Sequence, residues 1–170
     1  MALPAERGGR GIAMASPTAY LATPKTSAMS TGTTTPTRVT VSAHVAKPVD
    51  QVWRYYTAPE HIMQWNAASD DWHCPRAEND LRVGGRFSSR MEARDGSVGF
   101  DFGGTYTEMK PYEQFAYTMD DGRRCEVLFA RNGTGSQVTV TFDAETENPV
   151  EMQRGGWQAI LDRFKAYAEK

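Results

Sequence analysis

The sequence predicts an α+β fold in which a curved antiparallel sheet wraps around a long C-terminal helix. Three features support this prediction. Segments that alternate between apolar and polar residues recur between glycine-containing turns. Two short helical segments, 49–56 and 57–65, follow the first of these strands. The last segment, from Pro149 to the C-terminus, has one apolar stripe, which must pack on the sheet because a curved sheet cannot bury both faces on itself.

The strand assignments rest on periodicity and composition. Residues 38–45 alternate with period two and are rich in β-branched side chains, which is typical of a half-buried strand. Gly103-Gly104 lies inside a strand pattern and favours a bulge or a bend of the sheet there. Hairpin turns are expected at Asp95-Gly96, Asp121-Gly122 and Asn132-Gly133. Strands are expected at residues 38–45, 72–78, 86–93, 100–110, 114–119, 123–130 and 136–142.

The helices are predicted from their starts and apolar faces. Pro48 and Pro59 stand where helices tend to begin, and Val52, Trp53 and Tyr56 recur at helical spacing after Pro48. The C-terminal helix has basic residues in its second half, which suits the helix dipole. Its apolar stripe consists of Trp157, Ile160, Leu161, Phe164 and Ala168.

Residues 1–37 differ from the rest of the chain. They hold 11 Ser or Thr, four Pro and a single aromatic residue, Tyr20. Such a segment cannot bury enough apolar surface to offset its chain entropy, so we expect a disordered extension before one domain at residues 38–170. A targeting segment and an over-extended start, with Met14 or Met29 as the true one, remain open alternatives.

Composition excludes several classes of protein. The 19 Lys and Arg balance 21 Asp and Glu, which argues against binding driven by nucleic-acid phosphates. No apolar run approaches the roughly 20 residues of a membrane-spanning helix. Two cysteines cannot build a disulfide framework and suit a reducing compartment, so a cytoplasmic location is expected. His73-Cys74 fits no zinc spacing, and Gly-x-Ser-x-Gly and phosphate-binding loops are missing, so neither a metal nor a cofactor is expected.

Aromatic residues carry the main functional signal. Of the 18 in the chain, 17 follow residue 37, and many fall on faces that would point inward. Apolar walls with a few polar groups suit a small-molecule site. We expect Trp157 to be the main anchor and Tyr106 or Tyr117 to orient a polar group. The expected lining is Trp65, Phe87, Ser89, Met91, Tyr106, Tyr117, Trp157, Ile160 and Phe164.

Several motifs together resemble a known family. They stand in order at residues 46–53, 57–65, 80–87, 104–108 and 156–164. From about Val39 to the end, the chain resembles the SRPBCC (START/Bet v 1-like) superfamily, in the branch named for the C-terminal domain of the activator of Hsp90 ATPase. The resemblance implies the helix-grip fold. Ser89 stands where the branch often has an aromatic residue, which implies a roomier, more polar pocket, and Trp65-Asn66 replaces a common Trp-Trp pair.

The resemblance implies binding of a hydrophobic or aromatic small molecule, such as a lipid, a polyketide or a flavonoid-like compound. An enzyme of the cyclase or hydrolase type is a less favoured alternative. It would use Glu108 as base, because strand alternation puts Glu108 on the face of Tyr106, and Arg86 or Arg90 to stabilise an oxyanion. A third alternative is a chaperone cofactor, since the namesakes stimulate Hsp90, which would connect the chain to the stress response. The oligomeric state stays open.

Overall fold

The computed structural model describes residues 35–170, so most of the segment expected to be disordered, 1–34, lies outside the described residues. The helices are α2 (Val49–Thr57), α3 (Pro59–Trp65) and α4 (Val150–Ala168). The strands are β1 (Arg38–Val45), β2 (Trp72–Asn79), β3 (Arg86–Ala93), β4 (Gly99–Lys110), β5 (Gln114–Met119), β6 (Arg124–Asn132) and β7 (Gly135–Asp143).

The strands form one curved antiparallel sheet in the order β1-β7-β6-β5-β4-β3-β2. The predicted α+β architecture is therefore confirmed, and every predicted strand is present with ends within about two residues. The largest shift is in β6, because its pairing with β7 continues to Asn132 opposite Gly135. The predicted hairpin turns contain Gly96, Gly122 and Gly133, with φ of 78°, 91° and 64°, a left-handed conformation that glycine adopts without strain.

Of the two features predicted at Gly103-Gly104, a bulge or a bend of the sheet, the bulge is wrong, because both residues pair regularly with β3. The register shift lies further along β4, between Tyr106 and Glu108, where β4 pairs with β5. The two glycines instead allow the backbones of the neighbouring strands to approach β4 closely. A Cβ atom on Gly104 would lie 2.5 Å from the Thr118 carbonyl oxygen, so only glycine fits there without displacement.

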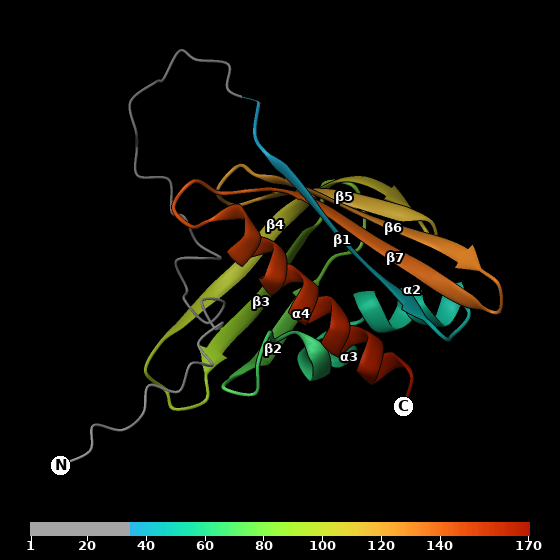
Figure 1. Cartoon of the computed structure of the whole chain (residues 1–170), viewed down its shortest axis with the longest axis horizontal. Helices are drawn as coiled ribbons and strands as arrows, with labels where there is room; N and C mark the ends of the chain where they lie inside the picture. Colours follow the sequence, from blue (N-terminus) through green and yellow to red (C-terminus); the bar gives the residue numbers. More distant parts are fainter. Residues whose placement is uncertain (1–34) are drawn as a thin grey trace.

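Helix α4 crosses the concave side of the sheet, and α2 and α3 lie near its C-terminal end (Figure 1). α4 also covers the free edge formed by β1. Arg154 Nη1 donates to the Thr40 carbonyl at 3.2 Å, Gln158 Nε2 to that of Ser42 at 3.0 Å, and Lys165 Nζ to that of His44 at 2.6 Å. These bonds occupy main-chain acceptors that an uncovered edge strand would offer to another chain.

The core has a main part and a smaller satellite. The main part joins the inner sides of β1 and β4–β7 to all three helices, with Val52, Phe142 and Phe164 fully buried. The satellite lies where β2, β3 and β4 meet, around Trp72 and Met91. Within residues 35–170, the helices lack the length and apolar character needed to cross a bilayer.

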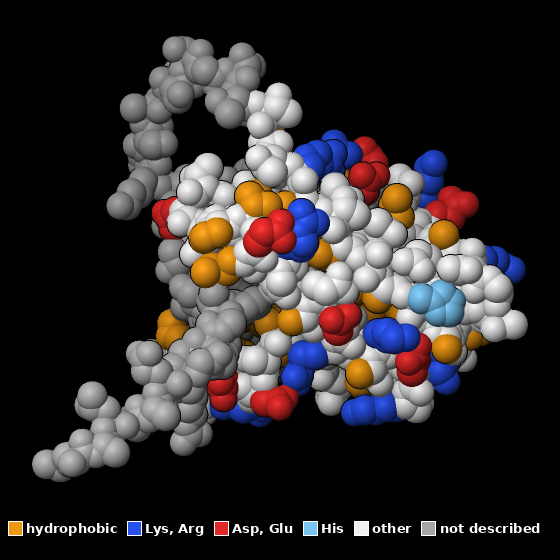
Figure 2. Space-filling view, in the orientation of Figure 1, with side chains coloured by type: hydrophobic (Ala, Val, Ile, Leu, Met, Phe, Trp, Pro, Cys, Tyr) orange, Lys and Arg blue, Asp and Glu red, His pale blue; other side chains and the backbone are white. Residues whose placement is uncertain are grey.

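The outer surface mixes charges of both signs. Figure 2 shows Lys and Arg beside Asp and Glu over the described part of the face in view, with hydrophobic side chains in small groups between them. Pairs such as Arg86–Asp120 at 2.9 Å and Arg163–Asp70 at 2.7 Å reflect this mixture. A surface of this kind agrees with the near-zero net charge of the sequence.

Candidate functional site: a cavity between the sheet and helix α4

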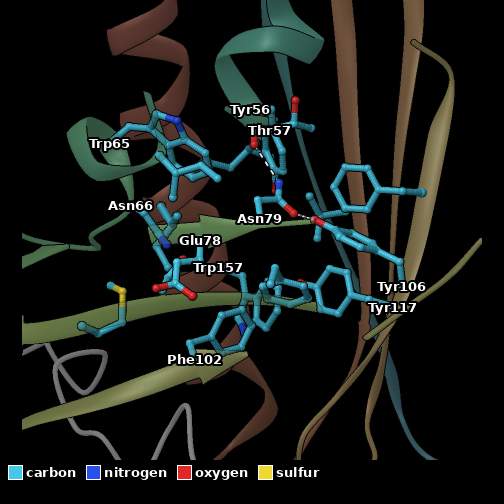
Figure 3. A pocket seen from close by; sticks show the side chains of 18 residues that line it. Tyr56, Thr57, Trp65, Asn66, Glu78, Asn79, Phe102, Tyr106, Tyr117 and Trp157 are labelled. Atoms are coloured by element: carbon cyan, nitrogen blue, oxygen red, sulfur yellow. Dashed lines mark hydrogen bonds between the residues drawn. The ribbon is translucent and has the colours of Figure 1, made fainter. Parts of the chain in front are cut away.

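A cavity of about 90 Å³ lies between the concave side of the sheet, α3 and the middle of α4. Its walls come from segments far apart in the chain, as Figure 3 shows for Trp65, Tyr106 and Trp157. Most of the lining is aromatic or aliphatic. The lining residues are Tyr56, Thr57, Ile62, Trp65, Asn66, Glu78, Asn79, Phe87, Ser89, Met91, Phe102, Tyr106, Phe115, Tyr117, Val140, Trp157, Ile160 and Leu161.

The structure brings eight of the nine predicted lining residues together at this cavity. They are Trp65, Phe87, Ser89, Met91, Tyr106, Tyr117, Trp157 and Ile160. The ninth, Phe164, is not part of the wall. It is fully buried behind it, with its ring 5.0 Å from the rings of Tyr56 and Trp65. Phe164 lies one helical turn after Ile160, where the apolar stripe of α4 packs into the core and no longer faces the cavity.

Trp157 is placed by contacts on both sides. Its ring stacks on Phe142 of β7 with centroids 4.1 Å apart and planes 11° apart, and it meets the edge of Phe102 at 6.2 Å. Helix α4 carries the indole across the sheet at this point, and the side chain is half-buried. The predicted anchor is thus a rigid wall of the cavity, because the stack leaves the ring little freedom to turn.

Tyr106 takes part in a hydrogen-bonded chain at one end of the cavity. Its hydroxyl donates to Asn79 Oδ1 at 2.7 Å, and Asn79 Nδ2 donates to the Thr57 carbonyl at 2.7 Å (Figure 3). Burial raises the pKa of Tyr106 far above its usual range. The chain ties β4 to the end of β2 and to α2, so it fixes the wall on three elements.

Tyr117 and Ser89 contribute two further hydroxyls. Burial is the main cause that raises the pKa of Tyr117, which lies opposite Cys125 of β6. Ser89 is buried in β3 beside Cys74, and burial raises the pKa of the Cys74 thiol to about 11. Both hydroxyls stand close to protonated thiols, which makes this part of the wall polar but uncharged.

Sequence reasoning missed ten lining residues, and some of them had a signal. Phe102 precedes Tyr106 by four residues in one strand, so alternation puts both on the same face. Tyr56 belonged to the predicted apolar stripe of α2 but was not included in the expected lining. Asn66 is the departure from the family's Trp-Trp pair, and it places an amide on the wall. Asn79 had no local signal, since its role depends on partners in α2 and β4.

The candidate base Glu108 does not face the cavity, which corrects the prediction from alternation. Its carboxylate accepts a hydrogen bond from Arg124 Nη2 at 2.8 Å on the outer side of the sheet. The register shift after Tyr106 breaks the alternation on which the prediction relied. Arg86 and Arg90 also point outward, where they pair with Asp120 and Glu92, each at 2.9 Å.

Glu78 is the carboxylate among the lining residues, and its side chain is exposed at the rim beside Asn66 (Figure 3). Neither Lys, Arg nor His lines the cavity, as far as residues 35–170 define it. In the same part of the chain, no three His, Cys, Asp or Glu side chains are grouped as metal ligands. The cavity is therefore suited to an uncharged, mainly apolar guest.

Comparisons with known proteins agree with this architecture. The family described as "Activator of Hsp90 ATPase homolog 1-like protein" matches residues 46–169. The solution structure of an AHSA1-like protein from Aeromonas hydrophila is 45% identical, with a TM-score of 0.75 over 78% of this chain and 92% of that one. A protein from Cytophaga hutchinsonii is also 45% identical, with a TM-score of 0.69 and the same coverage.

A crystal structure from Chromobacterium violaceum is 25% identical, covers 79% of this chain and 99% of that one, and has a TM-score of 0.70. Among curated proteins, no significant match is found. The family match spans the two short helices, most of the sheet and α4, which are the elements that enclose the cavity. The chain therefore belongs to the family of activator of Hsp90 ATPase homolog 1-like proteins, in the SRPBCC superfamily, and has its helix-grip fold.

Proposed function

We propose that the protein binds a small hydrophobic or aromatic molecule in the cavity between the sheet and α4. The observation that carries this proposal is the wall itself. Residues from α2, α3, α4 and five strands converge on one space and leave it unfilled, although protein interiors are otherwise close-packed. An unfilled space of this kind lowers stability, and an apolar guest would recover the loss at about 25 cal/mol per Å² of buried surface.

The volume narrows the class of guest. Pockets for drug-sized ligands measure roughly 300–1,000 Å³, whereas an apolar cavity of roughly 150 Å³ holds benzene. At about 90 Å³, this cavity is smaller than that, so one small aromatic ring with short substituents fits only if part of it extends into the open rim beside Glu78. A lipid, a polyketide or a flavonoid-like compound would need the walls to move apart, and the stacked Trp157 resists such movement.

A binding role is favoured over catalysis on the same space. An acid or base would have to reach the reacting atoms, yet Glu108 lies on the outer side of the sheet and pairs with Arg124. Glu78 lies at the rim and is exposed to solvent. Burial holds the tyrosines of the deep wall protonated, since it raises the pKa values of Tyr106 and Tyr117.

The test is a binding screen read by tryptophan fluorescence and thermal shift. Trp65 and Trp157 line the cavity and report directly on a guest. A panel of one-ring and two-ring aromatic compounds is expected to give saturable binding to the full chain. If no compound of the panel gives a saturable signal, the proposal is wrong.

A cavity-filling variant makes the screen specific. Ser89→Phe places a ring in the space, and we expect it to abolish binding, although overpacking costs about 1–3 kcal/mol of stability. Ser88→Phe is the matched control, because Ser88 is the neighbour in β3 that does not line the cavity. The control should bind as the wild type does, and binding that survives in folded Ser89→Phe would place the guest elsewhere.

A further inference from the structure

Tyr56 stands out among the three tyrosines of the cavity wall. It lies in the last turns of α2, and its ring packs between Trp65 and Phe164, with both centroids at 5.0 Å. Tyr106 enters from β4 and Tyr117 from β5, so three hydroxyls come from three elements. Cys125 and Tyr106, which both raise the pKa of Tyr56, belong to the core cluster against which Tyr56 packs.

The three hydroxyls differ in their surroundings. Tyr106 donates a hydrogen bond to Asn79 Oδ1, and Tyr117, which is buried, lies opposite Cys125 of β6. Within residues 35–170, the Tyr56 hydroxyl has no hydrogen-bond partner. It is not sealed in protein either, since Ser69 Oγ is the one unpartnered polar side-chain atom there that is fully buried. The free space that Tyr56 lines is the cavity.

A phenol in this position is a hydrogen-bond donor. Burial, reinforced by Cys125 and Tyr106, raises the pKa of Tyr56 far above its usual range, so the proton stays on the oxygen at any physiological pH. A polar group in apolar surroundings is costly unless it is paired. A guest with an oxygen acceptor at this end of the cavity would supply the missing partner.

The charges of the wall limit what that acceptor can be. No cation lines the cavity within the described residues, and the carboxylate of Glu78 stands at its rim. A carboxylate guest would lose its hydration without gaining a counter-charge, and Glu78 would repel it. The acceptor is therefore the oxygen of an uncharged group.

We propose that Tyr56 is the specificity-determining residue of the cavity, and that its hydroxyl donates a hydrogen bond to the carbonyl or hydroxyl oxygen of a small, uncharged aromatic compound. The ring of the guest lies against Trp157 and Phe102, and its oxygen points toward α2. This inference rests on the proposed function, since it names the class of guest and the residue that selects it.

The experiment compares ligands of one shape. Acetophenone carries a carbonyl oxygen, isopropenylbenzene replaces that oxygen by CH₂, and benzoate carries a charge. We expect the wild-type chain to bind acetophenone about tenfold more tightly than isopropenylbenzene, as one buried hydrogen bond would give, and to bind benzoate more weakly than either. Dissociation constants come from titration of the full chain, followed by tryptophan fluorescence.

Tyr56→Phe removes the one oxygen atom and keeps the ring. In this variant, acetophenone and isopropenylbenzene should bind equally, with the affinity for isopropenylbenzene unchanged. Tyr55→Phe is the matched control, because Tyr55 is the neighbour in α2 that does not line the cavity, and it should keep the tenfold preference.

The outcomes separate this inference from the proposed function. If the wild type binds neither neutral compound, this inference fails, and the panel of aromatic compounds decides whether the proposed function fails with it. If it binds acetophenone and isopropenylbenzene equally, or if the preference survives in Tyr56→Phe, the proposed function is retained and the proposed role of Tyr56 is wrong. Benzoate binding as tight as that of acetophenone would also overturn the uncharged class. Should Tyr56→Phe fail to fold, the wild-type affinities still test the preference for an uncharged oxygen acceptor, and a wild type without that preference overturns the inference.

Discussion

Phe142 of β7 and Trp157 of α4 stack face to face, with ring centroids 4.1 Å apart and planes 11° apart. The stack joins the C-terminal helix to β7, the strand next to the β1 edge of the sheet, and forms one wall of the cavity at the same time. Phe142 is fully buried, whereas Trp157 is half-buried and borders the empty space. One pair of rings therefore links the stability of the fold to the shape of the site.

Trp157→Ala should lower the free energy of unfolding by about 3 kcal/mol. That value is at the lower end for truncation of a large aromatic side chain, because the indole is only half-buried. Urea denaturation followed by circular dichroism measures it. Met152→Ala on the same helix is the control, since Met152 is exposed and its loss should change stability by at most about 0.5 kcal/mol. Equal midpoints for the two variants would contradict a structural role for the stack.

Two glycines are expected to respond to alanine in opposite directions. Gly155 lies in α4, where an added Cβ meets nothing within 4 Å, so Gly155→Ala should stabilise the protein by up to about 1 kcal/mol through helix propensity. Gly104→Ala brings a Cβ to 2.5 Å from the Thr118 carbonyl oxygen and should destabilise it by about 1–3 kcal/mol. Thermal and urea denaturation show whether each variant is more or less stable than the wild type. A neutral Gly104→Ala would mean that β4 and β5 can separate there at no cost.

The fold was predictable because its signals are local. Alternation within 38–45 and 86–93 gave strand bounds that match β1 and β3, and the stripe around Trp157 predicted α4. Glu108 was misplaced because a bulge of one residue reverses every face after it, and nothing in the residues around it indicates the bulge. The pattern shows which side chains share a face only as long as the register is regular.

The cavity was predictable as an aromatic wall but not as a volume. Whether a ring such as Phe164 lies on the wall or behind it depends on packing that differs by one helical turn. The free hydroxyl of Tyr56 and the paired one of Tyr106 look alike in a sequence. They differ because Asn79, 27 residues before Tyr106, reaches one of them and not the other.

Both cysteines should be unreactive in the folded protein. Burial raises the pKa of Cys74 to about 11 and that of Cys125 to about 12, and the thiolate is the reactive form. At pH 8, we expect a thiol reagent such as 5,5′-dithiobis(2-nitrobenzoate) to modify the folded chain slowly and the urea-unfolded chain at once. Cys74→Ser and Cys125→Ser identify the source of any residual signal. Rapid reaction of either thiol in the folded state would show that its segment opens readily.

Glu169 should make stability depend on pH at the end of α4. The Lys165 ammonium, 2.7 Å away, and the Ala46 backbone N–H, 2.8 Å away, lower the pKa of this carboxyl below its usual 4.5. A carboxyl whose pKa is lower in the folded than in the unfolded state stabilises the folded state at pH values above its unfolded pKa. The contribution is lost as the pH falls from about 4.5 through the folded pKa, where the group takes up a proton in both states.

Glu169→Gln therefore separates the charge from the rest of the side chain. At pH 7, the variant should be less stable than the wild type by at most about 1 kcal/mol, because the ion pair is near the surface. At pH 3, the difference should shrink as Glu169 is protonated, and salt should shrink it at pH 7. Glu147→Gln is the control, since this exposed carboxylate has no ion-pair partner among the described residues, and it should match the wild type at both pH values. A difference between Glu169→Gln and wild type that is equal at pH 3 and pH 7 would show that the amide disturbs packing and that the charge contributes nothing.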